Sequence, residues 1–171
     1  MELIIPSPAY FRSFSESLKE WGDAHQDGAG IRNPETLVTE EGFTEWVHQL
    51  ISEETEPAGR GFVTCSYRWM VDGDEYLGSI ALRHDLNDYL LNYGGHIGYG
   101  VRPSARRQGH ASQALAEILP VAIEQGLERV LVTCVESNEG SRRTIERQGG
   151  VLEDIRPQEH AEPVRRYWIE L

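Results

Sequence analysis

The sequence predicts an α/β (α+β) fold, in which a central sheet of about six to seven strands is flanked by helices. Two patterns predict it. Apolar runs of strand length alternate with longer segments whose apolar residues recur at helical spacing. The chain has 171 residues, enough to bury a sizeable core, and nothing in its composition suggests a second domain. We therefore expect one domain over residues 1–171.

The first third of the chain is predicted to form a short strand and two helices. Residues 3–5 have strand character, and Pro8 suits the first turn of a helix. Thr39 is a typical N-cap for the second helix. The apolar faces of the two helices comprise Tyr10, Phe11, Phe14, Leu18 and Trp21, and then Phe43, Trp46, Val47, Leu50 and Ile51.

A hairpin, two strand–helix units and two final strands are predicted to follow. Asp72-Gly73-Asp74 is a typical hairpin turn between apolar runs, and residues 87–92 form an irregular or short helical connection. Gly149 suits the left-handed end of the last helix. The expected strands are 62–71, 75–83, 96–101, 129–135, 151–155 and 164–171, with helices beginning after Gly109 and over 138–148.

The centre of the chain, residues 94–119, combines a strand, a basic loop and the start of a helix. The helix shows one apolar face, made by Ala111, Ala114, Leu115, Ile118, Leu119 and Ala122. A helix start leaves unpaired N–H groups and the positive end of the helix dipole, which together favour an anion. Arg102, Arg106 and Arg107 stand beside it. We therefore expect a phosphate or pyrophosphate site, although a solvated basic turn has the same composition.

The pattern Arg106-x-x-Gly109-x-Ala111 resembles the pyrophosphate loop of the GNAT superfamily of N-acetyltransferases. The stretch lacks the Gly-Lys-Ser/Thr of a nucleotide P-loop, and Gly98-x-Gly100 lacks the third glycine of a dinucleotide fingerprint. The resemblance implies acetyl-CoA as cosubstrate. The strand glycines at 98 and 100 suit a bulge or a close backbone approach, here by the pantetheine arm.

A second motif, Asn138-x-x-Ser141, resembles the other coenzyme A contact of that superfamily. Its alternative interpretation is a simple helix cap. The order of the predicted elements is that of the GNAT fold, which implies a mixed, mostly antiparallel sheet, and the sequence is similar to a group of bacterial predicted acetyltransferases. By resemblance, the coenzyme-binding residues are Tyr99, Gly100, Val101, Arg106, Arg107, Gln108, Gly109, His110, Ala111, Ser112, Asn138 and Ser141.

Acetyl transfer to an amine needs a base, because an amine with a pKa near ~10.4 is protonated at neutral pH. The candidates are Glu136, His84 and His96, and either histidine is also explained as a structural residue in a strand. A backbone N–H at a bulge over residues 99–101 is expected to stabilise the oxyanion. Many GNAT enzymes protonate the thiolate with a tyrosine of the last helix, where this chain has Ile145. Tyr99, Tyr93 and Tyr167 remain candidate acids.

The charge pattern bears on the partner and the location. The net charge of −12 argues against a nucleic-acid or anionic membrane surface. No signal peptide or membrane span is evident, which predicts a cytoplasmic protein, and Cys65 and Cys134 are expected as buried thiols. The six histidines are not clustered, so no metal site is expected.

Three functions remain open at this stage. The first is an N-acyltransferase acting on a small-molecule or peptide amine, as a monomer or homodimer. The second is an acetyl-CoA-binding sensor without turnover, and the third an acidic interaction domain. Residues 16–56 carry eleven acidic and two basic side chains, and by resemblance this segment forms a wall of the acceptor groove. Such a wall predicts a cationic acceptor, whereas a merely solvated surface predicts no preference.

Overall fold

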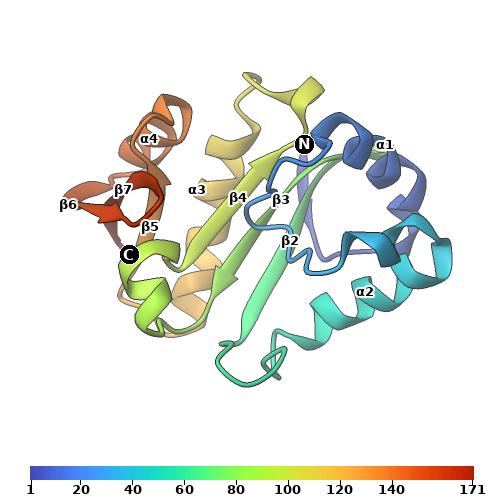
Figure 1. Ribbon diagram of the computed structural model, residues 1–171, viewed down its shortest axis with the longest axis horizontal. Helices are drawn as coiled ribbons and strands as arrows, with labels where there is room; N and C mark the ends of the chain where they lie inside the picture. The colour runs from blue at the N-terminus through green and yellow to red at the C-terminus, as the bar shows by residue number, and fades with distance from the viewer.

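The computed structural model describes all 171 residues, which fold around a seven-stranded sheet (Figure 1). The strand order is β1-β2-β3-β4-β5-β7-β6, and every neighbouring pair is antiparallel except β4 and β5. The predicted mixed, mostly antiparallel sheet is therefore confirmed. The strands are β1 (Glu2–Ile4), β2 (Cys65–Asp72), β3 (Glu75–Arg83), β4 (Ile97–Val101), β5 (Arg129–Val135), β6 (Val151–Gln158) and β7 (Ala161–Glu170).

Helices cover both faces of the sheet. On one face α1 (Phe11–Trp21) and α2 (Glu40–Ser52) pack an aromatic core against β2 and β3, and on the other face lie α3 (His110–Glu124) and α4 (Glu139–Arg147) (Figure 1). The strands supply both cores through the alternation of their side chains. Trp69 joins the α1–α2 core, for example, and Met70 the α3–α4 core. Each face of the sheet thus has its own set of neighbours.

The predicted helix starts are largely confirmed. The Oγ1 atom of Thr39 accepts a hydrogen bond from the N–H of Gly42 at 3.2 Å, as an N-cap should. Pro8 opens a short 3-10 turn, Pro8–Tyr10, and α1 begins after it. Helix α3 continues past Pro120 to Glu124, and Gly149 has a φ of 84° just beyond α4.

Three strands differ from the prediction by more than one residue at an end. β7 begins at Ala161, three residues earlier than expected, where it pairs with Gln158 of β6. β2 begins at Cys65, three residues later than expected, where the Cys65 N–H donates to the carbonyl of Glu53 at the end of α2. β6 extends to Gln158, because its pairing with β7 continues beyond Ile155. The connection before β4 contains a π-helical turn, Leu90–Gly94. This turn forms part of the cavity described next.

Candidate active site

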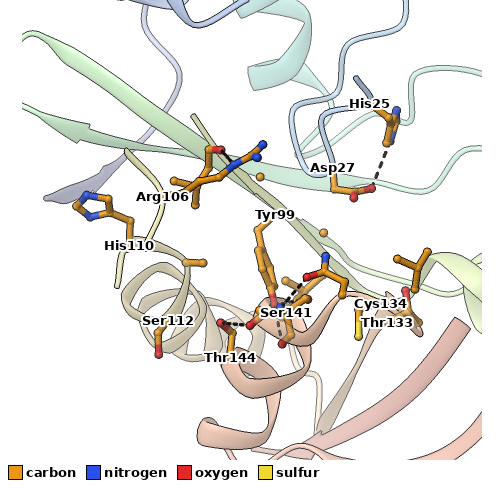
Figure 2. Close-up of a pocket in the computed structure, with 18 of the residues that line it drawn as sticks. His25, Asp27, Tyr99, Arg106, His110, Ser112, Thr133, Cys134, Ser141 and Thr144 are labelled. Carbon is orange, nitrogen blue, oxygen red and sulfur yellow. Dashed lines mark hydrogen bonds and ion pairs between the residues drawn. The ribbon is translucent and has the colours of Figure 1, made fainter. Parts of the chain in front are cut away.

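A cavity opens where β4 and β5 part. The two parallel strands share one residue pair, Ile97 with Val132, and then diverge. The cavity has a volume of about 840 Å³ and lies between these strands, the first turns of α3 and α4, the π-helical turn and the loop of residues 22–28 (Figure 2). Because it passes through the sheet, one half lies on the α1–α2 face and the other on the α3–α4 face.

The backbone of β4 turns polar groups toward this gap. The N–H of Arg83 donates to His96 and that of Arg102 to Leu77, so the hydrogen-bonded partners of β3 are the even-numbered residues of β4. Tyr99 and Val101 therefore turn their N–H and C=O groups toward the gap. The β3–β4 register has no shift, so the bulge expected over residues 99–101 is absent. Divergence of the strands, rather than a bulge, exposes these amides.

The start of α3 forms one end of the cavity. Gly109 is its N-cap with a φ of 89°, and Arg107 has a φ of 62°. The guanidinium of Arg106 donates to the carbonyl of Val101 at 3.1 Å and lies over the Trp21 ring at 4.7 Å. Arg147, which the sequence prediction omitted, also lines the cavity. All predicted coenzyme residues line it except Gln108. This end suits a polyanion.

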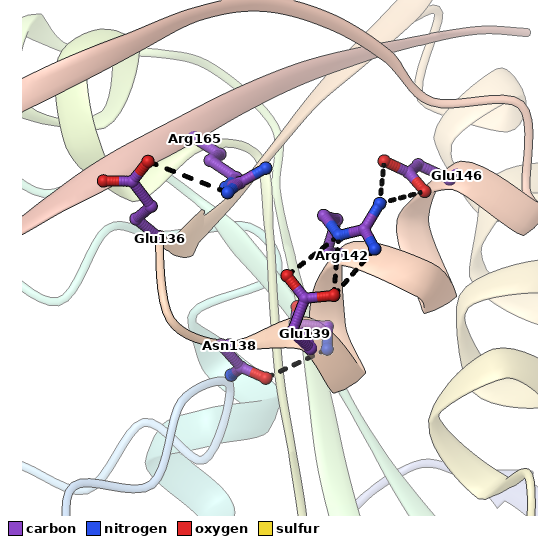
Figure 3. Close-up of polar contacts among 7 residues, drawn as sticks. Glu136, Asn138, Glu139, Arg142, Glu146 and Arg165 are labelled. Atoms are coloured by element: carbon purple, nitrogen blue, oxygen red, sulfur yellow. Dashed lines mark hydrogen bonds and ion pairs between the residues drawn. The ribbon is translucent and has the colours of Figure 1, made fainter.

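Asn138 caps α4. Its Oδ1 atom accepts a hydrogen bond from the N–H of Ser141 at 3.0 Å (Figure 3), so the capping role considered for it is real. Its Nδ2 group donates to no other protein atom and remains free for a ligand.

Tyr99 occupies the α3–α4 half of the cavity. Its hydroxyl lies 2.7 Å from the Oγ atom of Ser141, in the first turn of α4 (Figure 2). Burial raises the pKa of Tyr99 to about 12, so the phenol keeps its proton at neutral pH. Cys134 of β5 lines the same half, and burial raises the pKa of its thiol. Ile145 is fully buried in the core. Tyr99 of β4 thus places a tyrosine hydroxyl beside α4, the helix that has Ile145 where many GNAT enzymes have a tyrosine.

The loop of residues 22–28 covers the other half, on the α1–α2 face. A Cβ atom on Gly98 would lie 3.3 Å from the backbone N of Gly28, and one on Gly100 would lie 3.0 Å from the carbonyl oxygen of Asp27. The close approach at these two glycines is made by the chain's own loop, and their place beside the pantetheine stays a prediction. The two glycines fix the position of that loop.

His25 and Asp27 of this loop form a pair at the cavity. Their Nε2 and Oδ1 atoms are 3.3 Å apart, and the side chains are 83% and 72% exposed. Figure 2 shows the pair on the opposite side of the strands from Ser141 and Thr144. The sequence prediction missed both residues, whose one signal was a His-x-Asp spacing in a polar loop. His25 is the histidine that lines this half of the cavity, and it is therefore a candidate base.

The three predicted bases lie outside the cavity and have other partners. Glu136 faces Arg165 at 3.7 Å (Figure 3). The Nε2 atom of His84 lies 2.8 Å from the hydroxyl of Ser66, and burial lowers its pKa.

His96 links β4 to β5 just before the strands part. The ring Nδ1 atom of His96 accepts a hydrogen bond from the backbone N–H of Leu131 at 2.8 Å. The backbone N–H of His96 donates to the Leu131 carbonyl at 2.7 Å. Burial lowers the pKa of His96 to about 4, so the ring stays neutral at physiological pH. Since Nδ1 already accepts a hydrogen bond, the geometry favours a structural role for this histidine.

The acidic segment 16–56 contributes little to the cavity, because Asp27 is its one acidic residue there. Several of the others are neutralised within the fold. Glu53 binds Arg32, Glu54 binds Arg68, and Glu20 binds Arg102. The expected acidic wall of the groove therefore reduces to a single carboxylate.

None of the helices has the length and apolar character needed to cross a bilayer.

A family model described as an acetyltransferase (GNAT) domain matches residues 11–151. No curated protein matches the sequence.

Three solved structures illustrate the structural likeness. RimL, a ribosomal L7/L12 alpha-N-protein acetyltransferase in complex with coenzyme A, has a TM-score of 0.71 at 17% identity, covering 99% of this chain and 93% of its own. The microcin C7 self-immunity acetyltransferase MccE, in complex with acetyl-CoA and AMP, has a TM-score of 0.71 at 15% identity. The match covers 99% of this chain and 91% of that one. The ribosomal-protein-S5-alanine acetyltransferase of Vibrio fischeri has a TM-score of 0.72 at 15% identity. The match covers 98% of this chain and 91% of that one. At these identities the likeness concerns the fold.

Proposed function

The chain belongs to the GNAT acetyltransferase family, and from that premise we propose that it transfers the acetyl group of acetyl-CoA to an amine by direct attack. The observation that carries the proposal is the cavity through the sheet, with an anion-binding helix start at one end and a His–Asp pair at the other. One molecule can enter from each face. Their reacting atoms then meet between β4 and β5.

The coenzyme is assigned to the α3–α4 half. Its pyrophosphate would bind the backbone amides at the start of α3, beside Arg107 and Arg147, and the pantetheine would pair with the N–H and C=O groups of Tyr99 and with the N–H of Val101. Asn138 has a free amide for the same arm. In the RimL structure coenzyme A forms a disulfide with a cysteine of that protein. Cys134 lines the cavity here, and we place the thioester sulfur beside it.

The acceptor is assigned to the α1–α2 half, where His25 removes one proton from its ammonium group. The freed amine attacks the thioester carbonyl, and the N–H groups of β4 stabilise the oxyanion. The C–S bond then breaks, and a second amine proton passes to the sulfur. The Tyr99 hydroxyl, held by Ser141, donates a hydrogen bond to that sulfur as it leaves. The products are an N-acetylated amine, coenzyme A thiol and the proton on His25.

A sensor without turnover was suggested by the missing tyrosine at position 145. The hydroxyl of Tyr99 lies in the cavity beside α4 and can take the place of the missing tyrosine. The absence of a tyrosine at position 145 therefore does not favour the sensor over the enzyme. The enzyme is therefore the function that this geometry supports best.

Acetyl-CoA is expected to raise the melting temperature of the protein. At about a hundred times its Kd, a ligand of the folded state adds about 2.7 kcal/mol of stability, or a shift of roughly 5 to 10 °C at this chain length. Arg107→Gly should weaken the shift, because it removes a cation from the α3 start. Differential scanning fluorimetry with millimolar acetyl-CoA measures both, and no shift for the wild type would contradict the coenzyme assignment.

Arg107→Gly is a sharper variant than a bulky residue at Gly109. The left-handed backbone of Gly109 would strain any side chain, although the space around it is open. Arg107 has a left-handed φ of 62°, so glycine there relieves strain and the unliganded protein should melt at the same temperature or higher. Arg60→Gln, an exposed arginine outside the cavity, is the charge-matched control and should keep the full shift.

A further inference from the structure

Arg83, at the end of β3, lies in the acceptor half of the cavity. Its Nη1 atom donates to the carbonyls of Gly94 and Gly95 at 3.0 and 3.1 Å. Its Nη2 atom lies 3.6 Å from the position that a Cβ of Gly98 would occupy. Arg83 is therefore on the face of β4 that the loop with His25 and Asp27 covers. Its Nε and Nη2 groups donate no hydrogen bond within the protein.

Arg83 differs from the other arginines that are buried or half-buried, because it has no carboxylate partner. The other residues in this class are Arg68, Arg102, Arg142, Arg156, Arg165 and Arg166. Each of these makes an ion pair with a glutamate or aspartate. A cation withdrawn from water normally has a counter-ion. Arg83 is the arginine of this class without an intramolecular counter-ion, and it is also the one that lines the cavity.

The phosphates of the coenzyme are poor candidates for this counter-ion. They belong to the α3 start, which follows the far end of β4 after Val101, and Arg106, Arg107 and Arg147 line the cavity there. Arg83 contacts the opposite end of β4, at Gly98. Asp27, the one carboxylate that lines the cavity, pairs with His25 and makes no ion pair with Arg83. The acceptor is therefore the remaining candidate for the counter-ion.

The surroundings of Arg83 are also firmly held. The guanidinium of Arg166 donates to the carbonyl of Leu91 at 3.0 Å, and Thr133 donates to the carbonyl of Tyr93 at 2.8 Å. These bonds fix the π-helical turn whose carbonyls orient Arg83. A binding group positioned before its ligand arrives loses less entropy on binding.

We propose that the acceptor carries an anionic group, a carboxylate or a phosphate, on the same molecule as its amine. Arg83 binds this anion, while Asp27 attracts the ammonium group that His25 deprotonates. The inference rests on the proposed acetyl transfer and specifies its substrate class. It replaces the expectation of a purely cationic acceptor, such as a polyamine, with that of a zwitterion.

Matched pairs of amines test this proposal. Each L-α-amino acid is compared with its carboxamide, and phosphoethanolamine with ethanolamine, which separates carboxylate from phosphate. Coenzyme A thiol release gives kcat/KM, and titration calorimetry on the coenzyme A-saturated protein gives Kd. The best anionic probe should exceed its neutral partner by about tenfold to a hundredfold, the worth of a charge-assisted hydrogen bond.

Arg83→Gln should abolish this preference by lowering kcat/KM for the anionic member of each pair to that of its neutral partner, whereas Arg83→Lys should keep part of it. Arg60→Gln should behave as wild type, and melting temperatures show whether each variant is folded. Equal use and equal binding of both members of every pair by the wild type would overturn the proposal, as would a preference that survives Arg83→Gln. If no amine releases thiol, acetyl transfer fails, while calorimetry still decides whether Arg83 selects anions.

Discussion

Replacing His25 with glutamine is expected to lower kcat by about 10²-fold or more at neutral pH, with little change in acetyl-CoA affinity. His25 is paired with Asp27 in the acceptor half, and glutamine keeps a polar side chain but cannot take the amine proton. Initial rates at varied acceptor concentration measure kcat, and titration calorimetry with acetyl-CoA measures its affinity.

The titratable groups that line the cavity with His25 are Asp27, His110, Cys134, three tyrosines and four arginines, namely Tyr89, Tyr93, Tyr99, Arg83, Arg106, Arg107 and Arg147. Glu136→Gln and His84→Gln are the matched comparisons, because both residues lie outside the cavity. Each should retain wild-type kcat. A dead Glu136→Gln beside an active His25→Gln would transfer the role of the base to Glu136.

The largest expected effect on stability is that of Glu53→Ala, which should lower the free energy of unfolding by about 3 to 5 kcal/mol. Glu53 is 2% exposed, and its carboxylate accepts two hydrogen bonds from Arg32 at 2.6 and 2.7 Å. Tyr67 and Gln49 donate to it as well. Alanine leaves Arg32 without its counter-ion and opens a cavity in the α1–α2 core. The melting temperature should fall by roughly 6 to 20 °C.

Chemical denaturation measures this loss, with Glu56→Ala, an exposed glutamate nearby, as the control that should change little. The double variant Arg32→Met with Glu53→Leu should recover much of the stability, since apolar replacements of a buried ion pair are often neutral. A loss under about 1 kcal/mol for Glu53→Ala would contradict the assignment of this pair as a main support of the loop and α2.

Much of the fold could be predicted because its signals are local. The apolar period of α3, the cap at Thr39 and the turn at Asp72-Gly73-Asp74 depend on neighbouring residues alone. The basic turn and the start of α3 were predictable for the same reason, since the glycine and the arginines stand next to the helix start in the sequence.

The acceptor half could not be predicted, because it depends on pairing between distant residues. Whether a carboxylate is free or neutralised is decided by tertiary contacts, and Glu53 and Glu20 proved to be paired with arginines. Arg83 was inconspicuous in the sequence for the opposite reason, since its missing partner is visible only in the fold. The glycines of β4 signalled a close approach, but the partner was a loop about seventy residues earlier in the chain.

Release of coenzyme A thiol from acetyl-CoA, followed with and without amines, tests the central claim most directly. The two-sided cavity predicts release that depends on an acceptor and yields one N-acetylated product per thiol, identified by mass spectrometry. Tight binding of acetyl-CoA with no acceptor-dependent release, across the anionic and neutral amines together, would contradict acetyl transfer and favour a protein that only senses the coenzyme.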